Sequence, residues 1–255
     1  RVAGKRTTQG SLIFKDAMDD HSDPMIERLQ NAGAIILART TTPEFCLLGI
    51  TSSRIWGVTR NPWNTEWAPG GSSGGSGAAL AAGLTTLATG TDIGGSIRIP
   101  ASACGIVGFK PPHGRNPDGA PSNFDRFNHC GPMTRTVADA ALMQNITSGP
   151  HPLDHDSIRS RVKLPLKAES IKGMKIAYSL DFGYVEVDGN VRRNTLAALE
   201  AFRSLGAKAE EVDLKWGKSV DDDCMHWYNT MNFGRQTIWH KKTHAHLMTD
   251  YALKF

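Results

Sequence analysis

The chain has 255 residues, of which 40% are hydrophobic and 21% are charged, with a formal net charge of +4 at pH 7. This composition is that of an ordinary globular protein and excludes an intrinsically disordered chain. The basic residues are spread along the sequence without a block of like charges, which argues against a nucleic-acid partner. No apolar stretch approaches the ~18 residues of a spanning helix, so we expect no membrane partner.

The first predicted element is a short helix that follows Asp23. Asp23 is a residue type that caps helix N-termini, Pro24 suits the first helical position, and Gly33 suits the end. The apolar run 34–38 follows at once and predicts a strand that is buried on both faces.

Two Gly/Ser-rich stretches, 69–77 and 90–96, come next in the chain. Between them lie the apolar segments 78–82 and 84–88, which predict a buried helix and a buried strand. A flexible linker would be polar throughout. The glycines therefore predict backbone that packs closely between core elements or approaches a ligand.

The second half of the chain predicts another helix between strands. Segment 150–165 is polar, contains prolines and lacks periodicity, so it is the candidate for an exposed connection. After it, 175–178 predicts a strand, 190–205 a helix ended by Gly206, and 207–212 a further strand. Helices that lead into apolar strands predict an α/β fold with a mixed β-sheet core flanked by helices.

The cysteines and histidines do not indicate a metal site. No C-x-x-C pair occurs, so we expect reduced, mostly buried thiols at Cys46, Cys104, Cys130 and Cys224. Cys46 is interpreted as a small core hydrophobe. His240 and His244 are spaced for one helix face, but no H-E-x-x-H motif surrounds them, so an exposed helix face is the better interpretation. We expect neither a metal nor an organic cofactor.

Two serines lie in glycine-rich surroundings that could serve catalysis, Ser72 in Gly-Gly-Ser-Ser-Gly-Gly and Ser96 in Gly-Gly-Ser-Ile-Arg. A serine hydroxyl attacks well only when a base takes its proton and hydrogen-bond donors face the developing oxyanion. No G-x-S-x-G elbow surrounds Ser96, which argues against an α/β-hydrolase. No G-x-x-x-x-G-K-[ST] loop supports phosphate binding. By composition alone, the two loops leave the function open.

The sequence from Gly70 through Ser96 to Pro111 resembles the amidase signature, and the match is long and nearly without gaps. Segments 40–45, 61–64 and 131–139 are also similar to that family, although the resemblance fades beyond Leu214. It implies the amidase signature fold, which we expect to be incomplete at both ends. Residues 1–255 would form a partial domain with these parts: a signature core at about 61–149, the connection 150–165 and a further α/β segment at 170–255.

The resemblance implies a Ser–cis-Ser–Lys triad. Ser96 would be the nucleophile, and Ser72, joined to Gly71 by a cis peptide bond, would relay protons between Ser96 and a lysine. The oxyanion hole would be formed by the backbone N–H groups of Ile93, Gly94, Gly95 and Ser96. Supporting roles would fall to Ser73, as a hydrogen-bonding helper, and to Asp92 and Arg98, as an ion pair that braces the loop.

The triad lysine of the family has no counterpart in this chain. In the family it precedes the stretch that matches 4–11, and here the chain begins at Arg1, just after that position. Lys15 follows this stretch instead of preceding it, and Lys5 and Lys110 occupy positions that the family does not use for the base. We therefore expect an internal fragment that is inactive by itself.

The resemblance implies hydrolysis of a small-molecule carboxamide through a serine acyl-enzyme. One alternative is a glutaminase similar to the A-type component of glutamyl-tRNA amidotransferase, which would need partner subunits. The other alternative is a catalytically incomplete fragment or binding module. We expect a cytoplasmic protein, with a homodimer as the candidate assembly.

Overall fold

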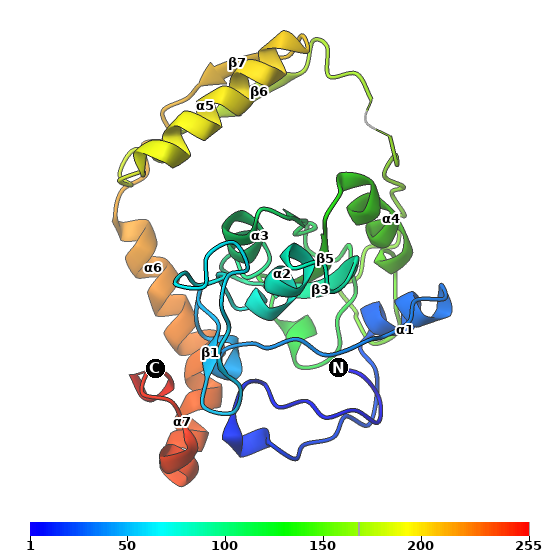
Figure 1. Ribbon diagram of the computed structural model, residues 1–255, viewed down its shortest axis with the longest axis vertical. Coiled ribbons are helices and arrows are strands. Elements are labelled where there is room, and N and C mark those ends of the chain that lie inside the picture. Colours follow the sequence, from blue (N-terminus) through cyan, green and yellow to red (C-terminus); the bar gives the residue numbers. More distant parts are fainter. Residues whose placement is uncertain (168, 255) are drawn as a thin grey trace. The chain divides into compact units, whose positions relative to one another are not determined.

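The computed structural model describes residues 1–167 and 169–254 (Figure 1). The chain divides into two compact units, unit 1 with Arg1–Leu166 and Asn232–Phe255, and unit 2 with Lys167–Met231. The sequence predicts one α/β segment over 170–255. Residues beyond 231 instead belong to unit 1, because the backbone and hydroxyl of Thr249 hydrogen-bond with the carboxylate of Glu44.

An antiparallel sheet of three strands lies in unit 1, in the order β3-β5-β4. Its strands are β3 (Leu87–Asp92), β4 (Val107–Gly108) and β5 (His129–Thr134), and Asp92 pairs with His129. The strand predicted at 84–88 begins later than expected. Gly83 has a φ of +72° and the N–H of Leu84 bonds back to Ala79, so these residues form the turn that ends the preceding helix.

Helices pack on this sheet through a small apolar core. Their bounds are Gly74–Ala81 for α2, Arg98–Cys104 for α3 and Val137–Thr147 for α4. Leu80 of α2, Met133 of β5 and Ile97, just before α3, are completely buried and form one cluster. Full burial of such a side chain stabilises a fold by ~1.5–3 kcal/mol. The cluster therefore fixes the two Gly/Ser-rich loops, because each loop leads directly into one of its helices.

The helix predicted after Asp23 is α1 (Pro24–Asn31), and Gly33 follows it with a φ of +91°. The strand predicted at 34–38 is wrong. This segment forms no strand, and the side chains of Ile35 and Leu37 are 84% and 74% exposed. No strand in the described part of the chain pairs with it, so its apolar residues line neither face of a sheet.

Unit 2 contains the helix and strands predicted from the sequence. Strands β6 (Lys175–Tyr178) and β7 (Lys208–Glu211) pair in parallel, and α5 (Gly189–Ser204) connects them. The Asp188 carboxylate caps α5 by accepting backbone N–H groups of its first turn. Gly206 follows α5 with a φ of +89°, as expected for a glycine that ends a helix.

The remaining elements are short or belong to the end of the chain. A two-stranded ribbon joins β1 (Ser52–Ser53) to β2 (Gly57–Val58). Helix α6 (Ser219–Trp227) lies in unit 2, and a π-helical segment (Tyr228–Asn232) leads into α7 (Phe233–His244). Single 3-10 turns occur at Leu12–Phe14, Glu44–Cys46, Ser122–Phe124, Ala245–Leu247 and Ala252–Lys254. None of the helices in the described ranges has the length and apolar character that a bilayer crossing requires.

Candidate active site

Ser72 lies at the N-terminus of α2, at the end of the first glycine-rich loop. The Gly71–Ser72 peptide bond is cis, as the sequence resemblance implied, and Ser72 is 2% exposed. A Cβ on Gly71 would lie 2.7 Å from the carbonyl oxygen of Ile50. Glycine is therefore required at position 71, because any side chain would collide with the backbone beside it.

Ser96 lies on the loop between β3 and α3, where it is half-buried. The backbone N–H of Ser73 donates to the carbonyl oxygen of Ser96 at 3.2 Å, which joins the two serine loops directly. The Ser73 hydroxyl also accepts the N–H of Thr91 at 3.2 Å and donates to the Thr91 carbonyl at 3.4 Å. Ser73 thus connects the start of α2 to the end of β3, a geometry that suits the helper role expected for it.

Asp92 organises the loop that carries Ser96. Its buried carboxylate accepts the Arg98 guanidinium at 2.8 and 2.9 Å, and the backbone N–H groups of Gly95, Ile97 and Arg98 at 2.7, 3.2 and 3.3 Å. Burial alone would raise the pKa of Asp92, but the hydrogen bonds and charge of Arg98, together with the N–H donors, hold it below its ordinary value. The ion pair expected from the sequence is therefore present, and the carboxylate stays charged.

This arrangement changes the expected set of oxyanion donors. The sequence assigned the N–H groups of Ile93, Gly94, Gly95 and Ser96 to that role. The Gly95 N–H already donates to Asp92, so Gly95 serves to shape the loop instead of facing an oxyanion. Ile93, Gly94 and Ser96 keep N–H groups that Asp92 does not hold, and these three are the remaining candidates.

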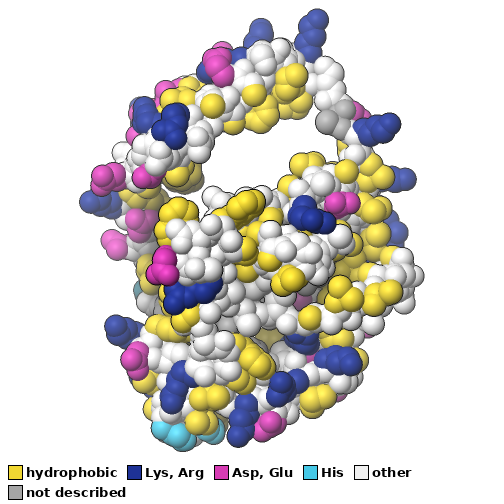
Figure 2. Space-filling view, viewed as in Figure 1, with side chains coloured by type: hydrophobic (Ala, Val, Ile, Leu, Met, Phe, Trp, Pro, Cys, Tyr) yellow, Lys and Arg dark blue, Asp and Glu magenta, His cyan; other side chains and the backbone are white. Residues whose placement is uncertain are grey.

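Apolar side chains lie beside both serine loops. Ile99 would be 2.8 Å from a Cβ on Gly95 and 3.0 Å from one on Gly70, so it contacts glycines of both loops. Ile99 and Ile50 remain 39% and 49% exposed. Exposed apolar side chains are numerous in the described residues, and Figure 2 shows them as separate groups among polar atoms.

Cys46 contacts the site, which the sequence interpretation missed. Its thiol hydrogen-bonds with the side chains of Ser72 and Thr42, so Cys46 is more than a small core hydrophobe. Burial raises the pKa of the thiol, and the two hydroxyl contacts only partly oppose this shift. The thiol therefore keeps its proton at neutral pH. The available signal was its position, directly after the family-like segment 40–45.

The lysines of the chain differ in their surroundings. Lys15 is exposed and lies 4.0 Å from the carboxylate of Asp16. The ammonium of Lys110 donates to the Pro111 carbonyl at 3.1 Å, and its pKa is lowered by burial and by the charge of Arg98. No contact between a lysine and Ser72 is found among the described residues, which leaves the base of a triad unassigned.

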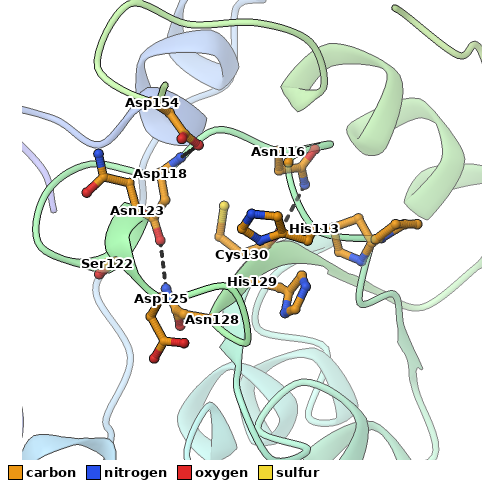
Figure 3. Close-up of a pocket in the computed structure, with 13 residues that line it drawn as sticks. His113, Asn116, Asp118, Ser122, Asn123, Asp125, Asn128, His129, Cys130 and Asp154 are labelled. Atoms are coloured by element: carbon orange, nitrogen blue, oxygen red, sulfur yellow. Dashed lines mark hydrogen bonds between the residues drawn. The ribbon is translucent and has the colours of Figure 1, made fainter. Parts of the chain in front are cut away.

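A separate polar pocket lies where the segment 111–130 folds against β5 (Figure 3). Asp118 is one of the residues that line it, and both of its carboxylate oxygens accept hydrogen bonds, from the Gly119 N–H at 2.8 Å and the Asn128 amide at 2.9 Å. Burial, together with the nearby charge of Asp23, raises the pKa of Asp118 to about 6. Neither Ser72 nor Ser96 lines this pocket, and it holds no group of three metal-ligating side chains in the described chain.

His240 is not on an exposed helix face, which corrects the sequence interpretation. Its ring stacks on Phe45 with centroids 5.7 Å apart and meets Phe14 edge-on at 5.3 Å. Burial lowers the pKa of His240, and the nearby His244 lowers it further. The imidazole therefore packs as an aromatic ring beside the turn that carries Cys46.

Comparison with known proteins gives one consistent family. The Amidase family model matches residues 1–243. An acylamidase from Rhodococcus erythropolis is 41% identical over 219 residues, which cover 85% of this chain and 46% of the relative. The A-type component of the glutamyl-tRNA(Gln) amidotransferase from Carboxydothermus hydrogenoformans is 40% identical over 216 residues, covering 84% of this chain and 44% of the relative.

The fold is also that of solved amidase signature enzymes. A bacterial aryl acylamidase of that enzyme family superposes with a TM-score of 0.90 and 30% identity, over 99% of this chain and 55% of its own. The A-type component of the glutamyl-tRNA(Gln) amidotransferase from Thermotoga maritima gives a TM-score of 0.76 and 28% identity, over 96% of this chain and 60% of its own. The chain spans about half the length of the curated relatives that it matches.

Proposed function

The chain belongs to the amidase family, and from that premise we propose that the protein hydrolyses a carboxamide through an acyl-enzyme on Ser96. The observation that carries the proposal is the hydrogen bond from the Ser73 N–H to the Ser96 carbonyl. It brings the loop of Ser72 against the loop of Ser96, in a region where Asp92 already orients the backbone around the nucleophile.

The proposed mechanism uses Ser72 as the proton relay. Ser72 takes the proton of the Ser96 hydroxyl and passes its own proton to a neutral lysine, while Ser96 attacks the carbonyl carbon. The oxyanion accepts N–H donors from Ile93, Gly94 and Ser96. The relay then reverses to protonate the leaving amine, and water releases the acid by the same route.

The lysine of this proposal lies outside residues 1–255. It must be neutral near pH 7, so its surroundings must lower its pKa by several units from ~10.4. We therefore expect residues 1–255 alone to give no turnover, and the full-length protein to be the active species. The four cysteines are unpaired, which fits the proposed cytoplasmic location because disulfides are rare there.

The exposed apolar side chains beside the serines favour a neutral amide over glutamine. Ile50 and Ile99 can cover an alkyl or aryl group of a substrate. The α-ammonium and α-carboxylate of glutamine would need charged partners, and the Arg98 guanidinium nearby is already paired with Asp92. The glutaminase function, with its partner subunits, is therefore the second candidate.

A substrate panel tests the proposal. Full-length protein is assayed with anilides, aliphatic amides and glutamine, next to a Ser96→Ala variant that cannot form the acyl-enzyme. We expect turnover of anilides or aliphatic amides that the variant lacks. Turnover of glutamine alone would favour the amidotransferase-like alternative, and activity that survives Ser96→Ala would exclude Ser96 as the nucleophile.

A further inference from the structure

Glu44 is a carboxylate in unit 1 that is 1% exposed and yet has no basic partner in its hydrogen bonds within the described chain. One oxygen accepts the Ser11 hydroxyl at 2.6 Å. The other accepts both the backbone N–H and the hydroxyl of Thr249, each at 2.6 Å. Hydrogen bonds to an ionised acceptor are among the strongest in proteins, so Glu44 ties together three segments that are remote in sequence.

Tyr251 strengthens the same connection from the end of the chain, which returns toward β1 after α7 (Figure 1). Its hydroxyl accepts the backbone N–H of Glu44 and donates to the carbonyl of Ser52, both at 2.7 Å. Both the side chain and the backbone of Glu44 are thus fixed by residues 249–251.

The turn that follows Glu44 has a backbone that side chains rarely adopt. Phe45 and Cys46 have φ values of +51° and +60°, in the left-handed region where residues with a Cβ are disfavoured. Such residues persist only where the surroundings determine them. Here the Phe45 N–H donates to the Gln9 carbonyl at 2.8 Å, and the Phe45 ring is held between Phe14 and His240.

The consequence of this turn is the placement of the Cys46 thiol against the Ser72 hydroxyl. A protonated thiol can donate to one lone pair of Ser72. The second lone pair then remains for the Ser96 proton, and the Ser72 proton remains for a base. This is the arrangement that a two-way relay needs, because each of its other contacts differs in donor and acceptor sense.

We infer that Glu44 is a positioning residue for Ser72: it holds the left-handed Phe45–Cys46 turn, and the Cys46 thiol orients the Ser72 hydroxyl toward Ser96. The inference rests on the proposed function for its catalytic consequence. Its structural content, the dependence of the Ser72 side chain on Glu44 through Cys46, stands on the contacts alone.

A double-mutant cycle in the full-length protein tests whether Glu44 acts through Cys46. The rate of Ser96 labelling by a fluorophosphonate is measured for Glu44→Ala, Cys46→Ala and the double variant. A misplaced catalytic group can cost up to ~100-fold, and we expect each single variant to label about 10-fold more slowly. Because both changes break one chain of contacts, the double variant should also be about 10-fold slower. A multiplicative loss of about 100-fold would contradict the inference.

Matched variants separate positioning from general destabilisation. Asn116→Ala removes another buried polar side chain, which bonds to Cys130 and Gln144 and lies outside the serine loops. It should lower the melting temperature without slowing labelling. Glu44→Gln can still accept from Thr249 through its oxygen and donate to Ser11, so it should restore most of the rate lost in Glu44→Ala. If Glu44→Ala does not fold, Thr249→Val takes its place in the cycle.

Crystal structures of the wild type and Cys46→Ala give a readout that does not need activity. We expect one Ser72 side-chain conformation in the wild type and a changed or divided one in the variant. An unchanged Ser72 conformation with unchanged partners would overturn the inference. If the wild type is not labelled at all but Ser72 still depends on Cys46, the proposed function fails while the positioning role holds.

Discussion

The backbone N–H of Ser73 donates a 3.2 Å hydrogen bond to the carbonyl oxygen of Ser96. This bond joins the first turn of α2 to the loop that precedes α3, so a displacement of either loop moves the other. The Ser73 hydroxyl adds two bonds to Thr91 at the end of β3. The relative position of Ser72 and Ser96 is therefore fixed by a residue that belongs to neither step of the proposed relay.

Ser73→Ala is expected to lower stability more than chemistry. The variant keeps the N–H bond to Ser96 but leaves the Thr91 N–H without its acceptor, which costs ~1–3 kcal/mol of unfolding free energy. Denaturant unfolding should show this loss, while fluorophosphonate labelling of Ser96 should remain measurable. A complete loss of labelling in a folded variant would mean that the Ser73 hydroxyl takes part in the reaction.

Arg98→Ala should weaken the protein in a way that depends on pH. Asp92 keeps its backbone N–H donors, and Arg98 is partly exposed, so we expect a loss of only ~1–2 kcal/mol at neutral pH. The folded-state pKa of Asp92 is lowered, so its contribution is present above the unfolded value of ~3.9 and disappears as pH falls through the folded value. Without Arg98 this pKa rises toward its ordinary value.

Urea unfolding of the wild type and Arg98→Ala between pH 7 and pH 3 measures this effect. The difference in unfolding free energy should be largest near neutral pH and should shrink as the medium becomes more acidic. A difference that stays constant over this range would show that Arg98 stabilises the loop by packing and not through the Asp92 charge.

Asp118 predicts the opposite pH dependence. Its pKa is raised from 3.8 to about 6, so the folded state holds a proton that the unfolded state has lost between these values. Stability from this group is complete below the unfolded pKa and is lost as pH rises through about 6. Asp118→Asn cannot titrate, so the curve of unfolding free energy against pH should become flatter between pH 4 and pH 6. An unchanged slope would contradict the raised pKa.

Much of the fold could be predicted where the signals were local. Pro24 and Gly33 bounded α1, and Gly206 marked the end of α5. The apolar run 34–38 misled the prediction, because periodicity indicates that a segment could be a strand but not that a partner strand is present. In the described chain it has none, and Ile35 remains exposed.

The candidate site divided in the same way. The family resemblance indicated Ser72, the cis peptide bond before it and the Asp92–Arg98 pair, because these residues lie in one continuous motif. The commitment of the Gly95 N–H to Asp92 could not be predicted, since a motif does not say which way an amide points. The contact between Glu44 and Thr249 spans 205 residues and has no local signature.

The central claim is that Ser96 is the acylated nucleophile and Ser72 its proton relay. Its most direct test is to treat the full-length protein with a fluorophosphonate and locate the adduct by peptide mass spectrometry, in the wild type, Ser96→Ala and Ser72→Ala. We predict an adduct on Ser96 in the wild type and none at that position in Ser96→Ala. Ser72→Ala should label ~10²–10⁴-fold more slowly, as expected when a general base is lost. An adduct on Ser72 that persists in Ser96→Ala and disappears in Ser72→Ala would contradict the account and make Ser72 the nucleophile.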